Sequence, residues 1–241
     1  MERPRLVATI TRLLTGLELV LLPPSCAGCG RRGAWFCSHC SALLKRESGP
    51  CCQRCDAPVV SSAAKCWRCD FWPAELLRVR APYTFDGPIR AAIHRAKYSG
   101  EHARARELGR LLATFATGEF ESALRPARLV VPVPLHPARR RERGYNQAEL
   151  LAAPVAEALG LVLAHSLVRQ RVTPSQAGSN REARQRNVME AFRWTGPALE
   201  GAVVLVVDDV VTTGATLAEV ARTLAAAGAT GVIGLALARE P

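Results

Sequence analysis

Lysine is scarce in this chain, because arginine supplies 29 of its 32 basic residues. Lys97 is the only lysine after residue 65, which indicates a use for a flexible ammonium group there rather than an arginine fork. The formal net charge of +11 favours a polyanionic partner. The same arginine bias is also compatible with a plain solvated surface, so charge alone assigns no partner.

A long apolar run is missing as well. The apolar stretch 13–22 is too short to span a bilayer, and Glu18 interrupts it. The arginines before it and Cys26 after it resemble parts of an export signal. One helical face, however, would carry Leu6, Ile10, Leu13, Leu14, Leu17 and Leu21. We therefore expect residues 1–24 to form an amphipathic helix that packs on the next module, in a cytoplasmic protein without a transmembrane segment.

Cysteine is absent after residue 69, and eight of the nine cysteines form four C-x-x-C pairs. Each pair places two thiolates at the separation that a tetrahedral Zn²⁺ ion needs, and a chain without a clear secretion signal favours metal ligands over disulfides. The spacing allows cross-braced as well as sequential pairing, and either predicts one or two structural zinc ions in a module of residues 25–73. Sequential pairing gives one site from Cys26, Cys29, Cys37 and Cys40, and another from Cys52, Cys55, Cys66 and Cys69.

Aromatic residues of this module stand among arginines. Trp67, for example, directly precedes Arg68. Such pairs can stack on the bases and grip the phosphates of a nucleic acid. They can equally form the small core of a zinc module, which has few other apolar residues to bury, and we favour the core. The turn at 71–73 then resembles a linker to the next domain. The aromatic residues concerned are Trp35, Trp67, Phe71 and Trp72.

The most informative stretch is 203–216, which reads V-V-L-V-V-D-D-V-V-T-T-G-A-T. The run 203–207 predicts a strand buried on both faces, with Asp208 and Asp209 where that strand emerges. Apolar residues then recur at helical spacing up to Gly228, which predicts a helix after the loop. A glycine and small hydroxyl residues before a helix can direct backbone N–H groups and the helix dipole at a phosphate.

No phosphate-binding lysine accompanies this loop. The pattern G-x-x-x-x-G-K-S/T is absent, so no lysine neutralises a triphosphate as in nucleotide-hydrolysing enzymes. Two carboxylates beside a bare phosphate would repel it. They fit a ligand that carries a phosphate at one end and hydroxyl groups or a bound Mg²⁺ ion nearby, which describes a sugar phosphate. The alternative is an ordinary strand end with solvated acids.

Two arginine-rich segments precede this motif. A strand at 129–136 ends early at its prolines and leads into the basic loop 137–147, where open α/β sheets bind ligands. The segment 167–192 is polar, glycine-containing and cationic, which is typical of a lid that excludes water. Both are also compatible with solvated loops. The other elements that we expect are strands at 78–85 and 232–238 and helices at 87–96, 101–117 and 148–159.

The stretch V-V-D-D-V-V-T-T-G-A-T resembles the phosphoribosyl pyrophosphate (PRPP) motif of type I phosphoribosyltransferases. The cysteine-rich module and the motifs I-H-R-A-K-Y, V-P-V-P-L-H-P, R-G-Y-N-Q, T-P-S-Q and R-Q-R-N, in this order, resemble the ComF-type competence proteins. The resemblance implies an α/β protein. Its residues 74–241 would form the type I phosphoribosyltransferase fold, a mostly parallel twisted sheet flanked by helices, after an N-terminal zinc-ribbon module.

The resemblance also implies roles for individual residues. Asp208 and Asp209 would face the ribose, with Mg²⁺ bridging ribose and pyrophosphate oxygens, and would act in catalysis together with Arg184 of the lid. Lys97 and Arg143 would also bind PRPP, the latter from the pyrophosphate loop. The 5′-phosphate would lie in the loop made of Thr212, Thr213, Gly214, Ala215 and Thr216.

The ComF family is linked to natural DNA uptake, and it acts inside the cell after single-stranded DNA enters. The resemblance therefore implies a cytoplasmic PRPP-binding protein of DNA uptake and transformation. Whether it transfers the phosphoribosyl group to an acceptor is left open by the sequence. One alternative is a non-catalytic, PRPP-regulated module that binds single-stranded DNA or a helicase partner. Another is a phosphoribosyltransferase of nucleotide salvage, unrelated to competence.

Overall fold

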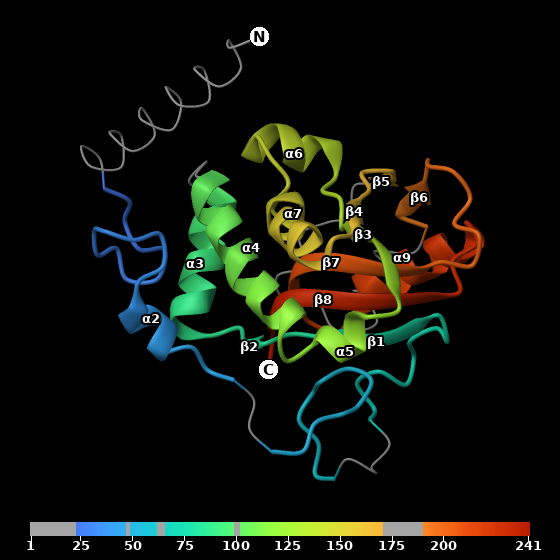
Figure 1. Cartoon of the computed structure of the whole chain (residues 1–241), viewed down its shortest axis with the longest axis horizontal. Coiled ribbons are helices and arrows are strands. Elements are labelled where there is room, and N and C mark those ends of the chain that lie inside the picture. The colour runs from blue at the N-terminus through green and yellow to red at the C-terminus, as the bar shows by residue number, and fades with distance from the viewer. Residues whose placement is uncertain (1–22, 47–48, 62–65, 99–101, 171–189) are drawn as a thin grey trace.

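The computed structural model describes residues 23–46, 49–61, 66–98, 102–170 and 190–241. The helix predicted before Pro23 and the predicted lid residue Arg184 lie outside these ranges. Within them, the chain forms a parallel sheet covered on both faces, with two cysteine modules packed against it (Figure 1). The predicted fold class is confirmed.

The centre of the sheet is formed by β7 (Val203–Val211) and β8 (Gly231–Arg239), which pair in parallel along almost their whole length. On the other side of β7 lies β3 (Ala127–Pro132), followed by the short β4 (Val162–Leu163). β1 (Leu76–Arg80) pairs with the free side of β8. The order β1-β8-β7-β3-β4 makes β7 and β8 the buried centre, as the apolar runs of their sequences predict.

Each face of the sheet has its own hydrophobic core, because successive side chains of a strand point to opposite faces. Leu205 and Val207 belong to the core under the helices α3, α4, α5 and α7. Val204 and Val206 belong to the core under α9. The prediction of a strand buried on both faces is therefore confirmed. The helices are α3 (Gly87–Tyr98), α4 (His102–Thr117), α5 (Glu121–Leu124), α7 (Gln147–Leu159) and α9 (Ala215–Ala226).

Helices α4 and α7 pack closely where α4 carries Gly109. An added Cβ atom there would lie 2.7 Å from the carbonyl oxygen of Leu150. The N-cap of α7 is Asn146, which accepts a hydrogen bond from the N–H of Ala148 at 3.2 Å and donates one to the carbonyl of Val133 at 3.0 Å. Asn146 thereby ties the start of α7 to the end of β3.

Two predicted boundaries near the site are wrong. The strand predicted at 78–85 is broken into β1 and β2 (Tyr83–Thr84), both of which pair with β8. The basic segment 137–147 is not a plain loop, because it contains the helix α6 (Pro137–Arg143). A proline suits the first helical position, and His136 caps the helix by accepting a backbone N–H.

The arginine-rich segment 167–192 begins and ends in a small antiparallel hairpin. Its strands are β5 (Leu167–Arg169) and β6 (Phe192–Trp194), and the intervening residues 171–189 lie outside the described part of the chain. The hairpin was not predicted, because three-residue strands are too short to show a period. The helices predicted at 87–96, 101–117 and 148–159 and the strand at 232–238 are confirmed to within a few residues.

The first cysteine module, which includes α2 (Ser38–Ala42), packs on the side of α3 and α4. Two arginines of those helices donate to its backbone. Arg95 reaches the carbonyl of Cys26 at 2.8 Å, and Arg104 reaches the carbonyl of Ser25 at 3.1 Å. These contacts join the module to the helical face of the sheet.

The second cysteine module packs on the opposite side, against the core that α9 covers. The N–H of Val79 in β1 donates to the carbonyl of Arg54 at 2.7 Å, and Arg239 at the end of β8 donates to the carbonyl of Cys55. Trp72 is only 5% exposed. The prediction of a linker-like turn at 71–73 is therefore wrong, because the turn is packed into the domain.

Candidate functional site

Asp208 and Asp209 lie where β7 loses one of its two neighbours. β3 pairs with β7 only as far as Pro132 opposite Val207, whereas β8 stays paired as far as Val211. The prediction that the strand ends before the acids is wrong, because pairing with β8 extends it through both of them. The acids still face an open edge of the sheet beyond the end of β3, where open α/β sheets bind ligands.

Lys97 meets the acids at this edge. Its Nζ atom lies 2.9 Å from Oδ2 of Asp209, and the two side chains are 21% and 17% exposed. The hydroxyl of Tyr145 donates to the carbonyl of Ala96, which fixes the end of α3 on which Lys97 stands. The lysine that the sequence singled out therefore lies beside the acidic pair, on a different element of the fold.

Asp208 holds a proton more tightly than an ordinary aspartate. Burial and the neighbouring carboxylate of Asp209 raise the pKa of Asp208 to about 7, against the opposing effects of a backbone N–H, Lys97 and Arg169. The backbone donor is the N–H of Asp209, at 2.8 Å from Oδ1. At neutral pH the site therefore carries less than two full negative charges, and a bound cation would release the proton.

Arg169 is a site residue that the sequence reasoning did not single out. Burial lowers its pKa, while the charge of Asp208 opposes that effect. Its guanidinium lies 5.4 Å from the centre of the Phe192 ring, across the hairpin of β5 and β6. Its position is set by the pairing of β5 with β6, and the short apolar pair before it carries no local signal that identifies it.

The predicted phosphate loop turns the chain from β7 into α9. Gly214 is the N-cap of α9 and has a φ of +79°, a left-handed conformation that favours glycine. The hydroxyl of Thr213 accepts a hydrogen bond from the N–H of Ala215 at 3.3 Å. Thr212 and Thr216 are half-buried on either side of the turn. The first turn of a helix leaves backbone N–H groups without helical partners, which suits an anion at this position.

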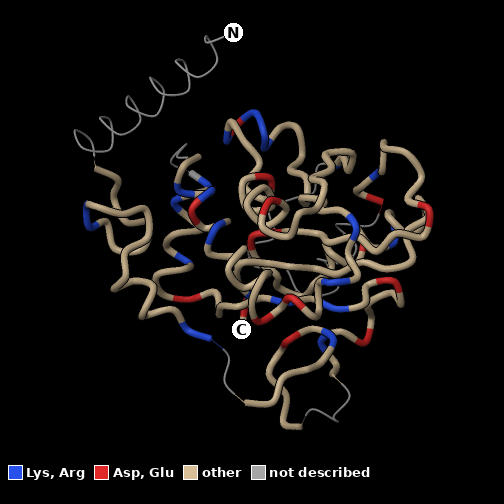
Figure 2. The backbone as a smooth tube through the Cα atoms, viewed as in Figure 1, with Lys and Arg blue, Asp and Glu red and all other residues tan. Residues whose placement is uncertain are grey.

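A cavity of about 670 Å³ opens beside the end of β3. Arg140 and Arg141 of α6 and Arg169 of β5 contribute to its lining, and the charge of Arg169 also acts on the carboxyl group of Asp208. Figure 2 shows the basic residues of α6 standing out at this end of the molecule. Arg143, predicted to bind PRPP, ends α6 and donates to Oε1 of Gln147 at 3.1 Å.

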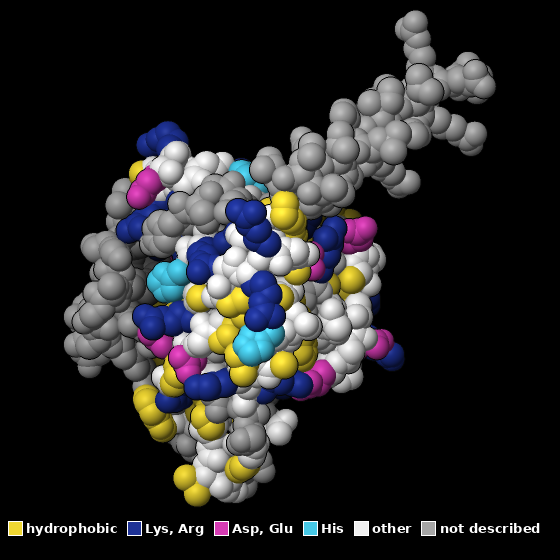
Figure 3. Space-filling model, turned by 90° about the vertical axis from the view of Figure 1, so that its left-hand side faces the viewer, with side chains coloured by type: hydrophobic (Ala, Val, Ile, Leu, Met, Phe, Trp, Pro, Cys, Tyr) yellow, Lys and Arg dark blue, Asp and Glu magenta, His cyan; other side chains and the backbone are white. Residues whose placement is uncertain are grey.

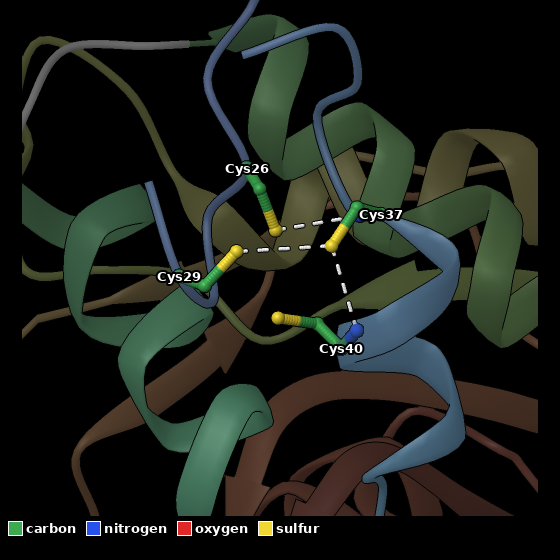
Figure 4. A group of neighbouring side chains, drawn as sticks. All are labelled: Cys26, Cys29, Cys37 and Cys40. Atoms are coloured by element: carbon green, nitrogen blue, oxygen red, sulfur yellow. Dashed lines mark hydrogen bonds between the residues drawn. The ribbon is translucent and has the colours of Figure 1, made fainter. Parts of the chain in front are cut away.

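The paired cysteines form two compact tetrads in sequence order, so the cross-braced alternative is wrong. The four Sγ atoms of each tetrad lie within 4.8 Å of one another, which suits one metal ion each. Figure 4 shows the four thiols of the first tetrad pointing toward a common centre. The Sγ–Sγ distances are 3.7 Å for Cys29 and Cys37, 3.7 Å for Cys52 and Cys69, and 3.6 Å for Cys55 and Cys66.

The thiols of each tetrad differ in pKa, because ionisation of one thiol opposes ionisation of its neighbours. Burial opposes ionisation of Cys26, but backbone N–H groups outweigh it and lower its pKa to about 6. Burial and the neighbouring thiols raise the pKa of Cys40 far above its ordinary value. For the same reasons the pKa of Cys52 is lowered to about 7 and that of Cys69 is raised to about 12. Four thiolates therefore coexist in a tetrad only around a cation.

The outer face of α3 is basic. Arg90, His94 and Arg95 are exposed there, next to the first cysteine module. Figure 3 views the molecule from this side and shows Lys, Arg and His side chains spread across it.

None of the described helices combines the length and the apolar character that crossing a membrane requires.

Comparison with known proteins places these features in a family. The family described as phosphoribosyl transferase domain matches residues 146–241, which contain the acids and the phosphate loop. The DNA utilization protein YhgH of Escherichia coli K12 is 33% identical over 203 residues, covering 83% of this chain and 88% of that protein. The competence protein ComFC of Bacillus subtilis is 31% identical over 195 residues, covering 78% and 77%. This chain belongs to the ComF family.

The ComF assignment agrees with the order of the parts, in which a cysteine-rich module precedes a phosphoribosyltransferase-like domain. A solved glutamine PRPP amidotransferase from B. subtilis, complexed with ADP and GMP, is 24% identical with a TM-score of 0.39. The match covers 58% of this ComF chain and only 30% of that enzyme.

Proposed function

We propose that this ComF protein binds PRPP together with Mg²⁺ along the open edge of β7. The observation that carries the proposal is the placement of Asp208 and Asp209 directly before a phosphate loop, with cations of two other elements beside them. Lys97 comes from α3 and Arg169 from β5. A ligand with a phosphate, vicinal hydroxyls and a pyrophosphate matches this set of groups.

Each part of PRPP has a complementary group in this arrangement. The N–H groups at the start of α9 and the hydroxyls of Thr212–Thr216 would hold the 5′-phosphate. The carboxylates of Asp208 and Asp209 would accept hydrogen bonds from the ribose hydroxyls. The cavity lined by Arg140 and Arg169 would take the pyrophosphate. Mg²⁺ held beside the carboxylates of Asp208 and Asp209 would neutralise part of the charge of the pyrophosphate.

A transferase reaction at this site would exchange one bond at C1 of the ribose. The nucleophile, usually a nitrogen, would form a bond to C1 while the C1–O bond breaks and pyrophosphate leaves with the electron pair. Positive charge builds on the sugar as the bond breaks, and ionised Asp208 and Asp209 stabilise it. We further propose that Arg143 binds the pyrophosphate and that Arg184 acts in catalysis from the lid.

Pyrophosphate release distinguishes a transferase from a binding module. The protein is incubated with PRPP, Mg²⁺ and a panel of nucleobases and amines, with Asp208→Ala as the control. Release above that control with one acceptor supports a transferase, and a nucleobase acceptor supports nucleotide salvage. Calorimetric binding of PRPP without release favours the non-catalytic, PRPP-regulated module. Absence of PRPP binding refutes the proposal.

Single-stranded DNA is a second candidate ligand, and the surface of the cysteine modules favours it. Trp67 is 64% exposed, and the guanidinium of Arg68 lies 5.4 Å from the centre of its ring. Exposed aromatic and arginine side chains are the groups that stack on bases of a single strand. The names of the E. coli and B. subtilis relatives refer to DNA utilization and competence. We therefore propose a cytoplasmic role in DNA uptake, with a helicase as a candidate partner.

Fluorescence anisotropy with a labelled oligonucleotide tests the DNA candidate. Binding should weaken steeply with salt, and Trp67→Ala should weaken it about fivefold, in the range of one lost base stack. Val60→Ala, which changes a fully exposed side chain of the same module, serves as the control. Absence of binding at low salt by metal-loaded protein would exclude direct DNA contact and leave a protein partner.

We propose zinc as the metal of both tetrads. Sites of four thiolates with no open position are typical of structural zinc, and each tetrad supplies such a set. Elemental analysis of protein purified without added metal should give about two zinc ions per chain, as two closed four-thiolate sites require. A Cys29→Ser or Cys66→Ser variant should retain about one, since each change damages a different tetrad. Zinc content near zero in the wild-type protein would contradict the assignment.

A further inference from the structure

A tryptophan of the second cysteine module supports the phosphate loop. An added Cβ atom at Gly214 would lie 2.4 Å from Cζ2 of Trp72, so the indole ring occupies the space of a side chain at that position. The indole Nε1–H also donates to the carbonyl of Thr213 at 3.2 Å. Both residues at the turn of the loop therefore contact a ring that comes from 141 residues earlier in the chain.

The second tetrad in turn fixes this tryptophan. The backbone N–H of Trp72 donates to the carbonyl of Cys69 at 3.2 Å. Arg54, inside the C-x-x-C turn 52–55, donates to the carbonyls of Cys69 at 3.1 Å, Trp72 at 3.3 Å and Pro73 at 2.6 Å. Its guanidinium also lies 5.7 Å from the centre of the Trp72 ring. The arginine thus clamps the tryptophan between the two cysteine turns.

The clamp is built on residues of the second tetrad. Cys69 provides both a thiol of the tetrad and a carbonyl that Arg54 binds. Arg54 itself stands in the sequence between Cys52 and Cys55 of the same tetrad. Since so small a module needs its metal to stay folded, loss of the metal would release the Cys69 end of the clamp, whereas Arg54 also donates to the carbonyl of Leu76 in β1 at 3.0 Å. The first tetrad differs, because its contacts run to α3 and α4 through Arg95 and Arg104.

We propose that Trp72 is a positioning residue of the phosphate loop and that the metal of the second tetrad controls PRPP binding through it. The proposal rests on the proposed function of the loop. Coupling between two sites is reciprocal, so bound PRPP must also retain the metal of this tetrad. Among the described residues, the contacts of the first tetrad run to α3 and α4 and none reaches the loop 212–216, so this tetrad provides an internal comparison.

Variants of the full zinc-loaded chain test the role of Trp72. We expect Trp72→Leu to weaken PRPP binding about tenfold by calorimetry, within the usual range for coupled sites, with zinc content unchanged. Trp72→Phe keeps a ring against Gly214 but loses the hydrogen bond, so its affinity should lie in between. Trp35→Phe, in the first module, should bind PRPP as the wild type does. Equal PRPP affinity of Trp72→Leu and the wild type overturns the proposal.

Chelation tests the reciprocal effect. At equilibrium with a chromogenic chelator, saturating PRPP should raise the zinc affinity of one of the two tetrads about tenfold. The protection should remain in Cys29→Ser, which keeps the second tetrad, and should disappear in Cys66→Ser and Trp72→Leu. Equal release with and without PRPP overturns the coupling.

Hydrogen–deuterium exchange separates this proposal from the proposed function. Without any PRPP, amides 212–216 should exchange about tenfold faster in Trp72→Leu than in the wild type, because local opening reports on lost contacts. Should the wild type fail to bind PRPP, the proposed function is refuted while this exchange result still decides whether Trp72 holds the loop. Unchanged exchange in both Trp72 variants refutes the positioning role.

Discussion

Replacing Asp208 by asparagine should stabilise the protein while it damages the site. The native protein keeps the proton of Asp208 up to about pH 7, whereas an unfolded aspartate releases it near 3.8. The native state therefore binds more protons between these values, and stability falls as pH rises through this window. The free-energy cost of ionising Asp208 in the folded state is absent below about pH 4 and reaches its full size above about pH 7. Asp208→Asn removes that cost.

The size of the gain follows from the pKa of Asp208. A pKa raised from 3.8 to about 7 corresponds to about 4 kcal/mol at full ionisation. The side chain keeps part of its surface in solvent, which screens the effect, so we expect about 2 kcal/mol at pH 8. At pH 5.5 the gain should be smaller, because part of the cost is already absent there.

Denaturant unfolding of zinc-loaded protein at pH 5.5 and pH 8 measures this gain. Asp86→Asn is the matched control, because Asp86 is exposed and pairs with Lys45, which lowers its pKa. That variant should gain no stability at either pH. A lower midpoint for Asp208→Asn than for the wild type at pH 8, or a gain that is larger at pH 5.5 than at pH 8, would refute the reasoning about the buried acidic pair.

Three further outcomes are expected. Lys97→Met should weaken PRPP binding about tenfold in a calorimetric titration, because a cation beside Asp209 is lost, while Lys45→Met, which breaks an exposed pair, should bind PRPP normally. Gly109→Ala should lower the free energy of unfolding by about 1–3 kcal/mol, since its Cβ atom would press on the backbone of α7, and an unchanged denaturation midpoint would contradict the close packing of α4 and α7. Removal of zinc by a strong chelator should melt both cysteine modules at room temperature, and far-ultraviolet and tryptophan signals that stay unchanged would show that the modules do not need metal.

The sequence predicted the parts of the site that lie within one continuous stretch. The loop from Asp208 to Thr216 combines a strand, a turn glycine and a helix start, and each has a local signal. The tetrads were predictable for the same reason, because the spacing of each C-x-x-C pair reflects the geometry of one ion. The choice between sequential and cross-braced pairing needed the fold.

Contacts between distant segments were not predictable. The end of β7 was placed too early, because the acids lie in a strand whose length is set by pairing with β8 rather than by its own residues. Trp72 was assigned to the core of a zinc module, and it does pack there, but its contact with Gly214 of the other domain was not predicted. Arg169 was part of an unpredicted hairpin. In each case a partner remote in sequence decides the position, and local propensity carries no record of it.

Calorimetric titration of the zinc-loaded chain with PRPP tests the central claim most directly. PRPP should bind at one site per chain, and its affinity should depend on Mg²⁺. The affinity should fall at least about tenfold when a chelator removes Mg²⁺, since the metal neutralises charge between the acids and the pyrophosphate. The double variant Asp208→Ala and Asp209→Ala should lose this binding. Absence of PRPP binding by the wild type, or equal binding by the double variant, would contradict the assignment of the open edge of β7 as a PRPP site.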